Sequence, residues 1–278
     1  MANVETGLLG DGVPYIRGGA GEREAAVFFG ASALFRRLDQ APAPGRYARQ
    51  VSRLLPGYRF TIFGYAGSSF ELIGQSIARA IGESRPDLVL GISLGGVVAL
   101  RFAARYPDLV RRLVLLVSAQ RFSAGGRRMM ERQLVALERG DFPTLVRENA
   151  LLFRRPWYNW LVRLKLWKEG SRLAAGYRDA AAILHDYRQL FGPDFELNAE
   201  YARRIVSPTL VLGGTADQYF DRAAFAETAR LIPGAQIQLF ERETHMLPIE
   251  QSGKVAGAIA DFVGGQADEV QRFSRGRR

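Results

Sequence analysis

The sequence predicts an α/β fold in which a mostly parallel central sheet is flanked by helices and carries an inserted helical cap. Short apolar segments alternate with segments of helical periodicity, which is typical of a parallel sheet covered on both faces. The interval 120–199 breaks this alternation, because it has helical patterns and almost no strand signal. We therefore expect a core in two parts, 1–119 and 200–265, separated by a cap at 120–199 and followed by a basic, disordered tail at 266–278.

The order of the elements follows from the apolar segments and from the glycines and prolines that end them. We expect strands at 13–16, 25–29, 59–63, 88–92, 113–117, 209–212 and 236–240. We expect helices at 46–55, 71–81, 94–106, 222–232 and 253–263. The strand at 13–16 is expected at an edge of the sheet, whereas 25–29 and 113–117 are apolar enough to be buried. Loops after the carboxyl ends of parallel strands share one edge of the sheet, where functional sites form.

The segment Gly91-Ile92-Ser93-Leu94-Gly95-Gly96 follows one of these strands and leads into a helix. It has the G-x-S-x-G pattern, in which a serine is held on a sharp turn in a strained backbone conformation. Because glycines lack a Cβ atom, the strand and the helix can pack closely around that turn. The helix N-terminus directs N–H groups and a positive dipole toward the serine, where an oxyanion would form.

A serine at neutral pH needs a base within hydrogen-bond reach, and the chain offers only His185 and His245. His245 follows the last predicted strand, and Asp217 follows the strand before it. The order Ser93, Asp217, His245 is the order of nucleophile, acid and base in the fold that uses this turn. We favour Asp217 over Asp221 as the acid because of its spacing after a glycine pair, and His185 falls inside the predicted cap.

These motifs resemble those of the α/β-hydrolase superfamily, in its cap-bearing serine hydrolase branch, and the resemblance covers residues 13–263. The G-x-S-x-G turn carries the resemblance together with the segments 208–217 and 245–250. The resemblance implies the α/β-hydrolase fold. It also implies that Ser93 is the nucleophile, that His245 is first a general base and then an acid, and that Asp217 orients the histidine.

The family usually has His-Gly after its third strand, and the residue that follows donates a backbone N–H to the oxyanion. Here Phe29-Gly30-Ala31 stands in that place, so the histidine is missing. Because the donor is a backbone group, the resemblance still implies an oxyanion hole made by the N–H groups of Ala31 and Leu94. Whether the loss of the histidine weakens this hole is left open by the sequence.

The predicted cap contains all three tryptophans, Trp157, Trp160 and Trp167. Together with Leu161 and Leu164, they fall on one helical face, so we expect this face to pack on the core or to form the roof of a pocket. We assign Trp157, Trp160, Phe29 and His185 to the substrate pocket. An apolar, aromatic roof indicates a hydrophobic substrate.

The charge of the same cap segment leaves other partners open. Between 154 and 172 the arginine and lysine residues are opposed only by Glu169. A basic helix with an aromatic face can lie on an anionic membrane or dock on an acidic carrier protein. The whole chain has a net charge of +10, but its basic residues are dispersed and no nucleic-acid-binding motif is present, so no nucleic-acid partner is expected.

The absence of cysteine excludes disulfides, thiolate metal sites and cysteine catalysis. Residues 1–12 lack a signal-peptide pattern and no apolar run is long enough to span a membrane, so we expect a cytoplasmic protein. The expected function is hydrolysis of an ester or related acyl bond of a hydrophobic small molecule through an acyl-enzyme on Ser93, with no cofactor or metal. Acyltransferases, thioesterases and C–C bond hydrolases share this triad, and some superfamily members bind ligands with little turnover.

Overall fold

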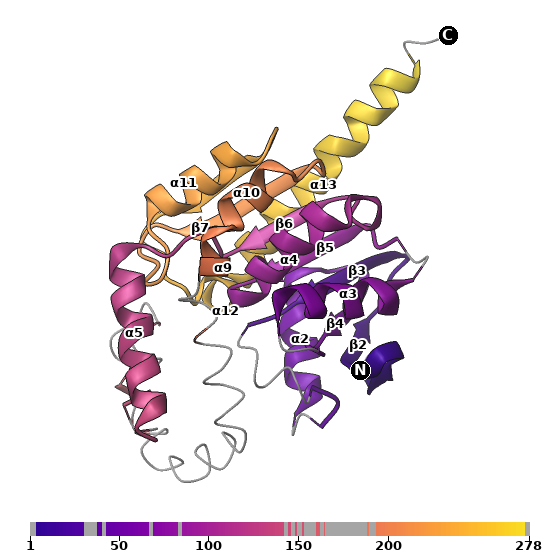
Figure 1. Cartoon of the computed structure of the whole chain (residues 1–278). Helices are drawn as coiled ribbons and strands as arrows, with labels where there is room; N and C mark the ends of the chain where they lie inside the picture. The colour runs from indigo at the N-terminus through magenta and orange to yellow at the C-terminus, as the bar shows by residue number, and fades with distance from the viewer. Residues whose placement is uncertain are drawn as a thin grey trace.

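The computed structural model contains an eight-stranded sheet with the order β1-β2-β4-β3-β5-β6-β7-β8 (Figure 1). The described residues are 4–30, 38–40, 43–66, 69–82, 85–141, 144–145, 148, 152, 160–161, 164, 188 and 193–275, the last ten without their side chains. The strands are β1 (Glu5–Leu9), β2 (Val13–Gly19), β3 (Arg23–Phe28), β4 (Tyr58–Phe63), β5 (Leu88–Ile92), β6 (Leu113–Leu116), β7 (Thr209–Gly214) and β8 (Gln236–Phe240). Only the pairs β1–β2 and β2–β4 are antiparallel, which confirms the predicted, mostly parallel α/β sheet.

The helices cover both faces of the sheet. They are α2 (Pro44–Leu54), α3 (Phe70–Ile81), α4 (Leu94–Arg105), α5 (Ala124–Glu138), α9 (Pro193–Glu196), α10 (Asn198–Arg203), α11 (Arg222–Leu231), α12 (Leu247–Glu250) and α13 (Ser252–Arg275). Three single-turn 3₁₀ helices are also described, η1 (Gly10–Gly12), η2 (Leu38–Gln40) and η3 (Pro107–Leu109). The crossover through α2 runs across the sheet in the opposite direction to those through α3, α4 and α11. Because such crossovers are right-handed, α2 lies on one face, where it packs against α13, and the other three lie on the opposite face.

The core is deepest around β5, β6 and β7, whose residues are all buried. The helix α4 is buried along most of its length, from Gly95 to Ala103, because it lies between the sheet and the helices α3 and α10. One charged side chain, Arg101, is buried there; its Nε donates to Oδ1 of Asn198 over 2.6 Å, and its guanidinium lies 4.4 Å from the ring centroid of Phe70. These central strands therefore hold the turn at Ser93 in a rigid frame.

The prediction of an edge strand at 13–16 is wrong. These residues form part of β2, which is paired on both sides, and the edge position belongs to β1, for which we predicted no strand. The segment Glu5–Leu9 is mostly exposed and contains two polar residues and a glycine, so it lacks the apolar signal by which strands are recognised. Its pairing with β2 decides its structure.

The described part of the interval 120–199 contains α5, α9 and the first residues of α10, and no strand. Figure 1 shows α5 extending away from the edge of the sheet. The boundaries of the cap stay a prediction, because much of the interval lies outside the described residues. The last helix is longer than expected: α13 continues past residue 263 to Arg275 and projects from the core (Figure 1). Disorder of the tail at 266–278 stays a prediction.

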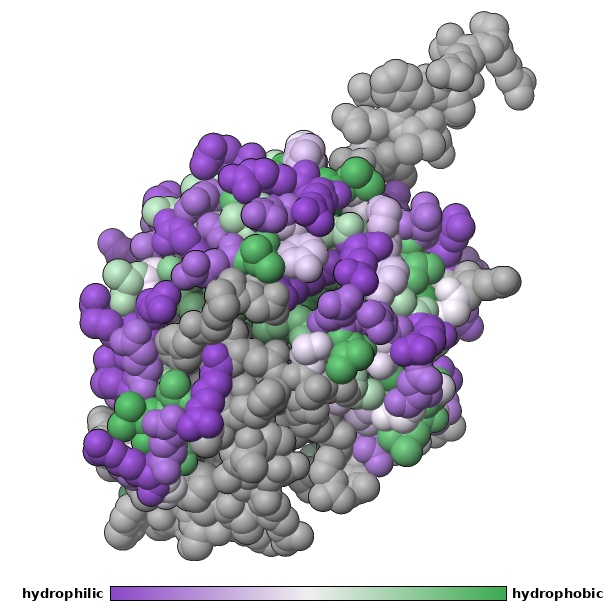
Figure 2. Space-filling model, viewed as in Figure 1, coloured by the Kyte–Doolittle hydropathy of each residue, from purple (hydrophilic) through white to green (hydrophobic). Residues whose placement is uncertain are grey.

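The described surface in Figure 2 is mostly hydrophilic, and hydrophobic residues appear on it in separate small groups. This agrees with basic residues that are dispersed along the chain and paired in exposed ion pairs, such as Arg222 with Glu241 over 2.6 Å. That ion pair lowers the pKa of Glu241, because the charged form of the carboxyl gains a hydrogen bond. Within the described residues no helix is both long enough and apolar enough to cross a membrane.

Candidate active site

Ser93 lies on the turn between β5 and α4 with φ 56° and ψ −127°, a conformation that costs free energy for any residue except glycine. Its N–H donates to the carbonyl of Leu116 over 3.0 Å, which ties the turn to β6. The neighbouring glycines are required by space. A Cβ atom at Gly95 would lie 2.1 Å from the carbonyl oxygen of Phe28, and one at Gly91 would lie 2.6 Å from the Cβ of Ala99.

The structure brings together the three side chains that the sequence selected. The Oγ of Ser93 lies 2.9 Å from Nε2 of His245, and Nδ1 of His245 lies 2.9 Å from Oδ2 of Asp217. The side chains of His245 and Asp217 are buried, with 6% and 0% exposed. The imidazole therefore lies between the hydroxyl and the carboxylate, with little access for water, in the arrangement that activates a serine.

The second oxygen of Asp217 is fixed by the backbone. Its Oδ1 accepts the N–H groups of Tyr219 and Phe220 over 2.8 and 3.1 Å, which orients Oδ2 toward the histidine. The alternative acid, Asp221, has another role: it is the N-cap of α11 and accepts the N–H of Ala224 over 2.7 Å. The carboxylate that contacts His245 is thus Asp217.

His245 is held by its neighbours on several sides. Its ring packs edge-on against Tyr219, with 4.7 Å between ring centroids, and at 6.1 Å from Phe220. Its backbone N–H donates to Oε1 of Gln218 over 3.2 Å. The Tyr219 hydroxyl accepts from the amide of Gln133, a fully buried residue of α5, over 2.9 Å. The loop after β7 therefore connects α5 to the histidine.

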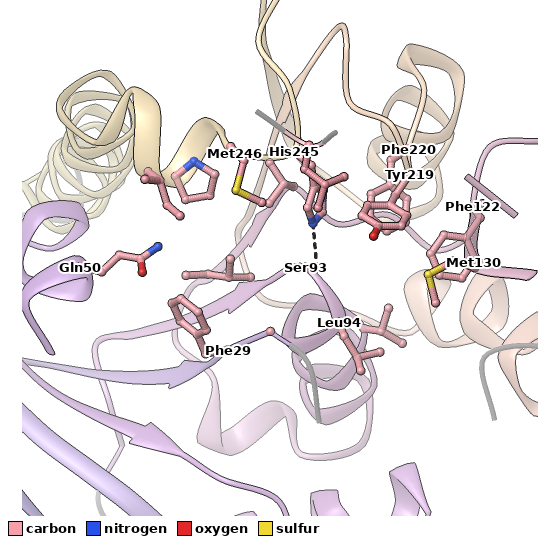
Figure 3. Close-up of a pocket in the computed structure, with 17 residues that line it drawn as sticks. Phe29, Gln50, Ser93, Leu94, Phe122, Met130, Tyr219, Phe220, His245 and Met246 are labelled. Carbon is pink, nitrogen blue, oxygen red and sulfur yellow. Dashed lines mark hydrogen bonds between the residues drawn. The ribbon is translucent and has the colours of Figure 1, made fainter. Parts of the chain in front are cut away.

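A cavity of about 240 Å³ opens beside Ser93 and His245 (Figure 3). Its described lining is mostly apolar and includes Phe29, Leu94, Phe122, Met130, Phe220 and Met246. The polar side chains among the described lining residues are those of Gln50, Ser93, Tyr219 and His245, and no acidic or basic side chain other than the histidine belongs to this lining. Such a cavity suits a hydrophobic small molecule with a few polar groups.

Residues 19–258 match the alpha/beta hydrolase family. The chain belongs to this family. Among the relatives of the chain, the 2-hydroxymuconate semialdehyde hydrolase of Pseudomonas putida is 29% identical over 190 residues, which are 66% of the chain and 64% of that protein. The monoacylglycerol lipase ABHD6 of Bos taurus is 28% identical over 197 residues, which are 65% of the chain and 56% of that protein. The match thus spans less than two thirds of the length of both relatives.

A solved structure supports the same fold. The enol-lactonase from Burkholderia xenovorans is similar to 94% of the chain and to all of its own length, with a TM-score of 0.69 and 18% identity. At this identity the likeness concerns the fold alone. The strand order with its antiparallel second strand, the serine turn after β5, and the acid and histidine after β7 and β8 are all present in this alpha/beta hydrolase.

One of the two residues predicted to form an oxyanion hole, Leu94, lies within the described residues. Leu94 is the first residue of α4, so its N–H has no acceptor within the helix and lies at the turn of Ser93. Ala31 lies outside the described residues, but the two residues before it are fixed. The Gly30 N–H donates to the carbonyl of Ile92 over 3.2 Å, and the buried hydroxyl of Tyr65 donates to the carbonyl of Phe29 over 2.8 Å.

The Phe29 ring also lines the cavity, as assigned. It packs edge-on against Tyr47 with 6.0 Å between ring centroids, and burial raises the pKa of Tyr47, which keeps this phenol neutral. Hydrogen bonding by Tyr65 and packing by Tyr47 thus hold the backbone at Phe29, where the chain lacks the histidine that is usual in the family.

Of the three pocket residues assigned within the predicted cap, the structure describes one. Trp157 and His185 lie outside the described residues. Trp160 is 62% exposed and is absent from the described cavity lining. Leu161 and Leu164, of the same predicted apolar face, are 44% and 36% exposed. The described part of this face is therefore exposed to solvent, and the prediction that it packs on the core is wrong for these residues. Helical periodicity shows that residues share a face, but it does not show what that face packs against.

Most of the residues that line the cavity were not predicted from the sequence. Phe122 and Met130 come from the start of the interval assigned to the cap, and Tyr219 and Phe220 follow the acid directly. Gln50, on α2, had no signal in the sequence, because a glutamine on a helix is usually an exposed residue. Proximity to the acid could have identified Tyr219 and Phe220. No group of three or more potential ligands for a metal ion occurs among the described residues.

Proposed function

We propose that this protein is a serine hydrolase that cleaves an ester or related acyl bond of a hydrophobic small molecule. The observation that carries the proposal is the continuous contact of Ser93, His245 and Asp217, at 2.9 Å for each step, beside an apolar cavity. The 2-hydroxymuconate semialdehyde hydrolase and the monoacylglycerol lipase among the relatives support this reaction class.

The reaction would begin when Nε2 of His245 accepts the proton of Ser93 and the Oγ forms a bond to the carbonyl carbon. The oxyanion would be stabilised by the N–H of Leu94 and, as the family resemblance implies, by that of Ala31. Nε2 would then return the proton to the leaving oxygen as its bond to carbon breaks, which leaves an acyl group on Ser93.

Water would complete the cycle. Its proton passes to Nε2 of His245 while its oxygen bonds to the acyl carbon, and the proton returns to the Ser93 Oγ as the acid leaves. Asp217 stabilises the imidazolium in both halves without becoming protonated itself. Entry of another nucleophile in place of water would give acyl transfer, the alternative that the same triad allows.

The test is hydrolysis of a p-nitrophenyl ester series from acetate to decanoate by the wild-type protein and by Ser93→Ala, together with labelling by a fluorophosphonate. We expect turnover and labelling in the wild type and neither in the variant. The chain-length optimum then measures the usable length of the cavity. A folded wild-type protein that neither hydrolyses the esters nor reacts with the fluorophosphonate would contradict the proposal and favour a ligand-binding role.

A further inference from the structure

Gln50 is the one polar side chain of the described cavity lining that belongs neither to the three contacting residues nor to the loop that holds them. It lies on α2, and its side chain is half-buried. Figure 3 shows its amide directed into the cavity, across from Ser93. Its amide forms no hydrogen bond with any described residue, so both its donor and its acceptor are available to a ligand.

The cavity has two unlike sides. In Figure 3, Phe122, Met130 and Tyr219 lie on one side of Ser93, and Gln50 and Phe29 lie on the other. Of these three residues on the first side, Tyr219 carries the polar group, and its hydroxyl already accepts a hydrogen bond from Gln133. A substrate bound at Ser93 would extend an apolar portion along the first side and a second portion toward Gln50.

The free-energy cost of leaving the Gln50 amide without hydrogen bonds determines which chemical group of a substrate can lie beside it. A ligand that covers Gln50 with a methyl or methylene group displaces water and leaves the amide without hydrogen bonds, which is unfavourable. The described lining residues offer no opposite charge to a carboxylate or an ammonium group beside the amide, because none of them except the histidine is acidic or basic. A neutral group with a donor and an acceptor matches both requirements.

We infer that Gln50 is a specificity-determining residue, which selects substrates carrying a neutral hydroxyl on the portion opposite their hydrophobic chain. The inference rests on the proposed function, because it names the substrate class of the same site. The substrate class is an ester that is apolar at one end and hydroxylated, but uncharged, at the other.

The test compares isosteric esters that differ by one hydroxyl. One pair has the hydroxyl on the alcohol portion, 2-hydroxyethyl hexanoate against propyl hexanoate. The other pair has it on the acyl end, methyl 6-hydroxyhexanoate against methyl heptanoate. Dissociation constants are measured by calorimetry on Ser93→Ala, and kcat/KM is measured on the protein with Ser93 intact.

We expect the hydroxylated member of at least one pair to bind about ten-fold more tightly, as one hydrogen bond in a partly buried site allows. In Gln50→Met, which keeps the length and helix propensity of the side chain, this preference should disappear. Met130→Leu, on the opposite side, is the matched control and should change the preferred chain length but not the preference for the hydroxyl.

Equal binding within both pairs, or a preference that persists in Gln50→Met, would overturn the inference. Since binding is measured on the variant without the nucleophile, this result does not depend on turnover. Failure of the proposed function would appear separately, as absent ester hydrolysis and absent fluorophosphonate labelling when Ser93 is present.

Discussion

The substitution Asp217→Asn tests the proposed role of the carboxylate without changing its shape. Oδ1 of Asp217 accepts two backbone N–H groups, from Tyr219 and Phe220, and only an oxygen can occupy that position. The amide nitrogen of the asparagine must therefore face Nδ1 of His245, where the carboxylate now lies at 2.9 Å. An N–H donor there requires Nδ1 to be the acceptor, so the proton moves to Nε2.

A proton on Nε2 faces the Ser93 hydroxyl and prevents the imidazole from accepting the serine proton. The same tautomer error in serine proteases lowers kcat by about 10⁴-fold, and we expect a similar loss here. This loss corresponds to about 5.4 kcal/mol in the activation free energy, at 1.36 kcal/mol for each factor of ten. The assay is kcat for the best p-nitrophenyl ester, with urea unfolding to verify that the variant is folded.

Asp221→Asn is the matched control, because it makes the same chemical change four residues along the chain. Asparagine is nearly as good an N-cap as aspartate, so α11 should remain capped and kcat should stay within about two-fold of the wild type. The reasoning would be refuted if Asp217→Asn kept more than a tenth of the wild-type kcat, or if Asp221→Asn lost as much activity as Asp217→Asn.

Other predictions concern the frame of the site. Gly95→Ala would place a Cβ atom 2.1 Å from a carbonyl oxygen of β3, so we expect it to lower the free energy of unfolding by about 3 kcal/mol. A midpoint of urea unfolding equal to that of the wild type would contradict this. Tyr65→Phe removes the 2.8 Å hydrogen bond to the Phe29 carbonyl; kcat should fall about five-fold with KM unchanged, and a fall in KM alone would argue against a positioning role. Asn198→Ala removes the acceptor for Arg101 at 2.6 Å and should cost about 2 kcal/mol of stability in urea unfolding, while ester hydrolysis by the folded variant stays unchanged.

The fold and the contacting side chains could be predicted because their signals are local. Strands buried on both faces are apolar throughout, and the turn at Ser93 requires small neighbours on both sides. The positions of Asp217 and His245 followed from topology, since loops after parallel strands meet at one edge of the sheet. Nothing about the distances between them was needed to select them.

The rest of the site depends on packing between distant segments, which periodicity does not encode. Gln50 reaches the cavity because α2 lies beside it, and Trp160 is exposed although its pattern resembles a buried face. The edge strand β1 has little apolar character and forms through its partner β2. Each of these features depends on which other segment packs beside it, and the local sequence pattern does not contain that information.

The separation of the three contacting residues along the chain has a consequence for folding. Ser93 lies after β5, in the middle of the sheet, whereas Asp217 follows β7 and His245 follows the last strand, β8. The serine and the histidine are 152 positions apart, and pairings of this range form slowly because long loops must close first. During refolding, the proposed activity should therefore return only after β7 has paired with β6 and β8 has paired with β7. Recovery of turnover would then report completion of the sheet, later than signals from helix formation or collapse.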